Sequence, residues 1–218
     1  MNRSMYNDQI NPGGKIILPE RRIHIPRHIK ERLTDLAKIS KDEADGVLFY
    51  SIIPKTVRVP YDNFGGLYEK KVASFDYFVE GVFMTGCGTS MRVRPLEERV
   101  KVANKFLEDN KNYGFAKFHT HTEETCRTNL RNAYYFSRGD KEGMDRQLRD
   151  NPWFIELLFT PYSVSAYGTP VLRVLIKETN INDIQREEDL GKKIDKIAYE
   201  LGVDLKNNRL ICHKQRYR

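Results

Sequence analysis

The order of helical and extended patterns is the feature that most limits the fold of this chain. Apolar residues recur at helical spacing over 27–40. Short runs rich in β-branched and aromatic residues follow between 46 and 95, and Gly, Asn and Pro separate them. A second helical pattern over 95–110 leads directly into the extended run GFAKFHTH, residues 114–121. Helices that alternate with groups of strands are typical of α/β proteins, so we expect helices packed on a sheet.

The second half of the chain continues this alternation. An apolar run at 153–160 predicts a further strand, and 162–177 predicts two strands around a Gly-Thr-Pro turn. A last helical pattern ends at Gly202, and the tail after it is basic. We expect a loose arm over residues 1–20, one folded domain over 21–178, and a helical extension with a basic tail over 179–218.

Composition excludes two classes of protein. The chain has 218 residues, of which 39% are hydrophobic and 31% charged, so it is long enough for a real core and is not a disordered chain. Its mean hydropathy is −0.63, and no apolar run approaches the roughly 18 residues of a membrane-spanning helix. The first residues lack the hydrophobic stretch of a secretory signal, and the three cysteines show no CxxC spacing. We therefore expect a reduced, cytoplasmic protein with no membrane partner.

The formal net charge of +7 favours acidic partners, nucleic acid among them. The basic excess gathers at 21–41, at 91–105 and in the C-terminal tail. These basic residues are not interleaved with aromatic residues as they are in a base-stacking surface. A solvated basic exterior is therefore the favoured interpretation, and nucleic acid is the weaker alternative.

A His-x-His pair closes the strand predicted at 114–121. Alternation sends His119 and His121 to the same face of the strand, about 6.5 Å apart along it. Two imidazoles so placed can reach one metal ion. Two polar residues on a solvated sheet face would give the same pattern, so the pair alone leaves both interpretations open.

Three further polar residues are candidates for a metal site formed by the two histidines. Ser137 and Asp140 open a predicted helix, where they suit an N-cap and the helix dipole, yet they also point the same way and could both face a metal. Glu43 lies where an acidic loop enters the first strand of the group. It is either a general base or an ordinary exposed glutamate.

Taken in order, these residues resemble the JAB/MPN+ (JAMM) zinc metalloproteases, a family that includes deubiquitinating isopeptidases. The likeness covers about residues 22–178 and rests on Glu43 and Gly46, on His119 and His121, and on the Ser-x-x-Asp of SRGD. It implies a cytidine-deaminase-like JAB/MPN α/β fold, with a curved mixed β-sheet packed against helices. It also implies that His119, His121 and Asp140 bind Zn²⁺, while Glu43 moves the proton and Ser137 binds the attacking water or the oxyanion.

The implied activity is zinc-dependent hydrolysis of amide or isopeptide bonds in conjugates of a ubiquitin-like or other small β-grasp protein. The sequence is also compatible with a homo-oligomer or with membership of a larger complex. The alternative from another class is a non-catalytic MPN-type scaffold, but that class lacks the metal-binding set present here.

The segment 122–136 is longer than its counterpart in the family, where Ser follows the second His by about eight residues instead of sixteen. We expect a lid or a substrate-reading element over the cleft. Cys126 within it could occupy the fourth zinc position and close the site, or it could be a free surface thiol.

Overall fold

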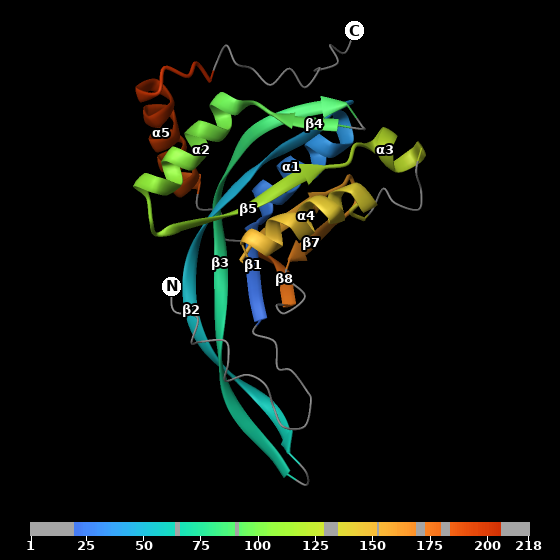
Figure 1. The fold of residues 1–218 in the computed structure, drawn as a ribbon, viewed down its shortest axis with the longest axis vertical. Helices are drawn as coiled ribbons and strands as arrows, with labels where there is room; N and C mark the ends of the chain where they lie inside the picture. The colour runs from blue at the N-terminus through green and yellow to red at the C-terminus, as the bar shows by residue number, and fades with distance from the viewer. Residues whose placement is uncertain are drawn as a thin grey trace.

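All the strands that the structure describes belong to one curled, mixed sheet. The computed structural model describes residues 20–63, 66–89, 92–128, 135–151, 153–168, 173–179 and 184–205. The strands are β1 (Glu20–Pro26), β2 (Glu43–Asn63), β3 (Gly66–Thr89), β4 (Arg92–Pro95), β5 (Tyr113–Thr120), β6 (Ile155–Phe159), β7 (Val164–Gly168) and β8 (Arg173–Thr179). Their order is β7-β6-β5-β2-β3-β1-β8, with β4 added to β3 (Figure 1). The end strands β7 and β8 also contact each other, so the sheet is strongly curled.

The sheet combines parallel and antiparallel pairs, and the His-x-His strand β5 lies between β2 and β6. β5 pairs antiparallel with β2 and parallel with β6. β1 is parallel to both of its neighbours, β3 and β8. The predicted mixed α/β sheet is therefore confirmed in its coarse form. β1 was not expected, because its sequence ERRIHIP has only two apolar positions before the proline.

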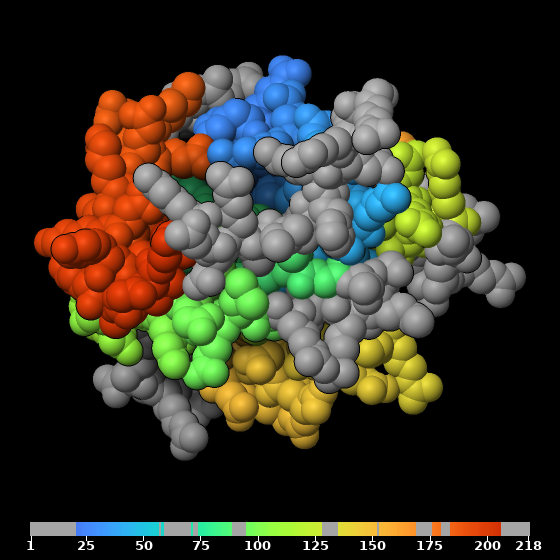
Figure 2. All heavy atoms as spheres, turned by 90° about the horizontal axis from the view of Figure 1, so that it is seen from above, coloured from blue at the N-terminus to red at the C-terminus, as the bar shows by residue number. Residues whose placement is uncertain are grey.

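Helices cover both faces of the sheet. α1 (Arg27–Ile39) packs Ile29 and Leu33 onto the face that carries Ala116 and Phe118. α2 (Glu97–Asp109) and α5 (Ile184–Glu200) pack together on the opposite face, against Phe49 and other apolar side chains. Viewed from above, α2 and α5 lie on one side of the molecule and α3 (Glu123–Thr128) on the other (Figure 2).

The helix within the proposed C-terminal extension packs on the same body as the sheet. α5 lies within the proposed extension 179–218, and its Leu190, Ile194, Ile197 and Ala198 are buried in a core cluster shared with α2 and the sheet. Residues 1–19 of the proposed arm and 206–218 of the proposed tail lie outside the described residues. No helix among the described residues is long and apolar enough to cross a membrane.

β2 and β3 are much longer than any of the other described strands and form a projecting ribbon. The sequence pattern predicts short strands separated by Gly, Asn and Pro, whereas β2 runs continuously through Pro54. β5 pairs with β2 only as far as Ser51, so beyond that residue β2 has a neighbour on one side only among the described strands. Proline is tolerated on such an edge because no second strand needs its missing N–H. The ribbon extends away from the body (Figure 1).

Gly46 allows β2 and β5 to pack closely beside the site. A Cβ atom at this position would lie 2.5 Å from the Phe83 carbonyl oxygen and 2.6 Å from the Phe118 ring. We therefore expect Gly46→Ala to destabilise the fold by about 1–3 kcal/mol, as overpacking does. Urea unfolding midpoints will measure this. Gly143→Ala in α4 (Arg138–Asp150) is the matched control, since nothing lies within 4 Å of its added Cβ, and it should stabilise slightly. A Gly46→Ala midpoint equal to wild type would contradict the close packing.

Candidate metal centre

The two histidines leave the end of β5 toward the same side, as the alternation predicts. Ala116 and Phe118 are fully buried in the core under α1, and His119 points to the other face. His121 follows the last residue of β5, and its backbone N–H donates to the Phe159 carbonyl at 2.9 Å. Both side chains are buried, at 7% and 6% exposure. The alternative of two solvated surface histidines is therefore wrong.

α4 brings a carboxylate to this pair. Ser137 is the N-cap of α4, where its side chain accepts from the Asp140 backbone N–H at 3.1 Å. Asp140 in turn accepts from the Ser137 backbone N–H at 2.7 Å, which completes a capping box. The same Asp140 oxygen faces the histidines. The capping interpretation and the metal interpretation of Ser-x-x-Asp are therefore both satisfied by one geometry.

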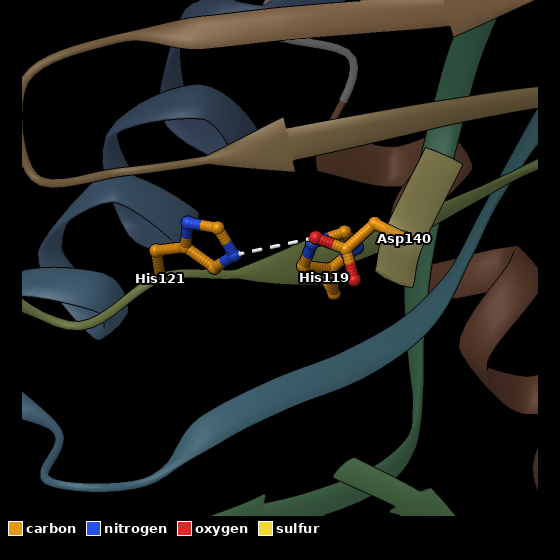
Figure 3. Close-up of side chains that lie close together, drawn as sticks. All are labelled: His119, His121 and Asp140. Atoms are coloured by element: carbon orange, nitrogen blue, oxygen red, sulfur yellow. Dashed lines mark ion pairs between the residues drawn. The ribbon is translucent and has the colours of Figure 1, made fainter. Parts of the chain in front are cut away.

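His119, His121 and Asp140 form a compact ligand group. One ligand atom from each lies within 4.8 Å of the others. The Asp140 Oδ2 atom lies 3.7 Å from His119 Nε2 and 3.9 Å from His121 Nε2. Figure 3 shows the three side chains converging from β5, from the residue just after it and from α4. Nε2 atoms and a carboxylate oxygen that converge in this way can hold one metal ion.

Glu156 on β6 orients the first of these ligands. Its Oε1 lies 2.8 Å from His119 Nδ1. A carboxylate can only accept, so Nδ1 carries a proton and Nε2 is directed at the group. Burial lowers the pKa of His119, but the carboxylates of Glu156, Asp140 and Glu43 outweigh it, so the pKa is raised. For Asp140, burial raises the pKa, but His119 and the hydrogen bonds from Ser137 outweigh it, so the pKa is lowered and the carboxylate is ionised.

An unpaired buried nitrogen tests whether a metal fits here. His119 Nε2 is buried and has no hydrogen-bond partner among the described residues. Such an atom is costly to bury unless something binds it. A carboxylate behind one imidazole nitrogen and a metal before the other is the usual arrangement of a metal-binding histidine. The residues present therefore fit a divalent metal, and two His with one carboxylate is a donor set of catalytic zinc sites.

Glu43 lies beside the ligand group on the neighbouring strand. It is the first residue of β2, and its backbone neighbour Ala44 donates to Thr120 Oγ1 on β5 at 2.8 Å. Its side chain is 6% exposed, so the interpretation as an ordinary exposed glutamate is wrong. Burial raises the pKa of Glu43 to about 7, and Asp140 adds to the effect while Thr125 and His119 oppose it. A carboxyl group with a pKa near 7 can both take and return a proton at neutral pH.

Within the segment 122–136, residues Glu123–Thr128 form the short helix α3. Residues 129–134 lie outside the described residues, but α3 packs inward with Thr122 at 0% and Cys126 at 2% exposure. Cys126 is therefore not a surface thiol. It is also absent from the metal-ligand group found among the described residues. Burial raises the pKa of its thiol, and Glu43 and Glu123 add to this, which disfavours the thiolate that a zinc ligand must be. The fourth-ligand hypothesis thus gains no support.

Two residues that contact the site were not found by sequence reasoning. Glu156 holds His119, and Thr125 donates to Glu43 at 3.1 Å. Glu156 is the only charged residue in the apolar run WFIELLFT, and that isolation is a signal that could have identified it. Thr125 has no comparable signal, because a threonine near a helix start is ordinary.

Comparison with known proteins does not assign a family, so any assignment of function rests on the geometry of the site. No protein-family model matches this chain, and a search of curated proteins finds no match. What stands is an α/β chain in which two buried histidines, His119 and His121, and the half-buried Asp140 form a group that could bind a metal ion.

Proposed function

We propose that this chain is a zinc-dependent hydrolase of amide or isopeptide bonds. The observation that carries the proposal is the convergence of His119, His121 and Asp140, with a buried Glu43 beside them. A metal site combined with a carboxyl group near neutral pKa is the pairing that metal-assisted hydrolysis requires. Catalytic zinc sites keep three protein ligands and one open position, and the three candidate ligands here would supply such a set.

Each residue has a distinct task in this proposal. His119, His121 and Asp140 hold the ion, which when bound supplies a Lewis acid. Glu43 takes the proton of the attacking water and returns it to the leaving amine. Ser137 Oγ accepts the Asp140 N–H, so its own hydroxyl proton is available to a developing oxyanion. Glu156 fixes the tautomer of His119.

The substrate class rests on the resemblance to JAMM-type isopeptidases. The ordered set of Glu43, the His-x-His pair and Ser-x-x-Asp is that family's set, and the sheet with helices on both faces is compatible with its fold. We therefore propose ubiquitin-like or other small β-grasp protein conjugates as substrates.

A panel of ubiquitin-like conjugates and a small isopeptide substrate will test this proposal. We expect about one zinc per chain in the purified protein and hydrolysis that a chelator abolishes and added zinc restores. A non-catalytic scaffold would hold no stoichiometric metal and cleave nothing. Hydrolysis that is unaffected by complete metal removal would also contradict the proposal.

A further inference from the structure

α3 makes a direct contact with the proposed general base. Thr125 Oγ1 lies 3.1 Å from Glu43 Oε1. This is the sole hydrogen bond to the Glu43 carboxylate from the part of the chain that the structure describes. Among the described residues, Glu43 Oε2 accepts no hydrogen bond. The two oxygens of this carboxylate therefore differ, because one is hydrogen-bonded and the other is not.

The hydroxyl of Thr125 is itself fixed by Thr122 at the start of α3. The Thr125 backbone N–H donates to Thr122 Oγ1 at 3.2 Å, and the two hydroxyl oxygens lie 3.1 Å apart. An ionised carboxylate can only accept, so Thr125 donates its proton to Glu43. The Thr125 oxygen is then the acceptor toward Thr122. The result is a series of two hydrogen bonds in which Thr122 donates to Thr125 and Thr125 donates to Glu43.

The position of α3 depends on packing and not on its own stability. A helix of six residues is too short to be stable alone. It is held by the burial of Thr122 and Cys126 and by its contact with α1. The Thr125 hydroxyl therefore reaches Glu43 only while α3 is docked on the body.

We propose that Thr125 is a positioning residue for Glu43: it engages Oε1 and leaves Oε2 as the oxygen that exchanges the proton. This inference rests on the proposed function for its catalytic part. Its structural part, the Thr125–Glu43 hydrogen bond, does not. The segment that is enlarged relative to the JAMM pattern thereby supplies part of the support for the general base.

Thr125→Val removes the hydroxyl and keeps the shape, and Thr125→Ser keeps the hydroxyl. In Thr125→Val we expect the acidic limb of the pH profile of kcat/KM to move up by about one to two pH units. The lost hydrogen bond stabilises the ionised form of Glu43, and a hydrogen bond to a charged group contributes a free energy equivalent to a pKa change of about that size. KM and zinc content should stay at wild-type values, and Thr125→Ser should return the limb toward wild type. Thr34→Val on α1 is the matched control, since among the described residues the Thr34 hydroxyl donates to the Lys30 and Glu31 carbonyls and not to a carboxylate.

A second readout does not need activity. ¹³C-labelled glutamate in the metal-free protein, with Glu43→Gln to assign the signal, reports the Glu43 titration directly. Thr125→Val should raise its midpoint, and Thr125→Ala should do the same if the valine variant fails to fold. Equal midpoints in wild type and in a folded variant would overturn the proposal, as would a serine variant that behaves like valine. If no substrate is cleaved by the wild type, the proposed function fails, and the titration still decides whether Thr125 holds Glu43.

Discussion

Glu43→Gln will keep the metal and the fold but lose about 10²–10⁴-fold in turnover, the usual share of general acid–base catalysis. Glutamine has nearly the same shape as glutamate and can still accept the Thr125 hydrogen bond, but it cannot take a proton. Glu43 is not one of the three grouped ligands, so zinc content should not change.

Single-turnover rates and zinc content, measured on the same preparation, will separate the two effects. Glu142→Gln is the matched control, because Glu142 is exposed on α4 and pairs with Arg138 away from the ligand group. Turnover close to wild type in Glu43→Gln would remove Glu43 from the mechanism. A variant that loses zinc together with activity would instead make Glu43 a ligand.

His121→Ala will abolish tight zinc binding. A catalytic zinc site with three protein ligands loses one of them in this variant, and the Asp140 oxygen 3.9 Å away keeps its charge without that partner. We expect a loss of affinity larger than the roughly 10–100-fold that accompanies loss of a residue behind a ligand. Glu156→Gln should fall within that smaller range, because Glu156 contacts His119 and is not itself a ligand.

Competition with a chromophoric chelator will rank the affinities of wild type, Glu156→Gln and His121→Ala. His28→Ala is the control, since His28 bonds Glu187 on α5 and is remote from the ligand group. Affinity should also fall as the pH is lowered, because protons compete for the imidazoles. Full zinc content in His121→Ala would make the assignment of this ligand wrong.

Local sequence patterns predicted the positions of single side chains near the ligand group better than they predicted the pairing of the sheet. The alternation of β5 places His119 opposite Ala116 and Phe118, and a period of two residues is a local property that sequence shows directly. The Ser137 capping box is local too. The convergence of Asp140 with the histidines joins residues from separate elements, so local spacing left it open and the family resemblance implied it.

The features that the sequence did not predict depend on long-range pairing. β1 is held by parallel neighbours that follow it by about 50 and 150 residues along the chain, so its own short, charged sequence gave little signal. The continuity of β2 through Pro54 depends on β5 beginning opposite Ser51, so that β5 does not extend alongside Pro54. Glu156 and Thr125 reach the site from separate elements, and only the folded chain shows their partners.

The β2–β3 ribbon also affects how the molecule moves through water. The part of the ribbon with no further described strand on either side, residues 55–63 paired with 66–74, runs for roughly 30 Å at about 3.3 Å per residue. A compact domain of this chain length has a radius of gyration of only about 17 Å. Mass placed so far from the centre raises viscous drag and makes tumbling anisotropic, with end-over-end rotation slower than rotation about the ribbon axis. In solution the protein therefore behaves as a larger particle than its 25.6 kDa mass implies.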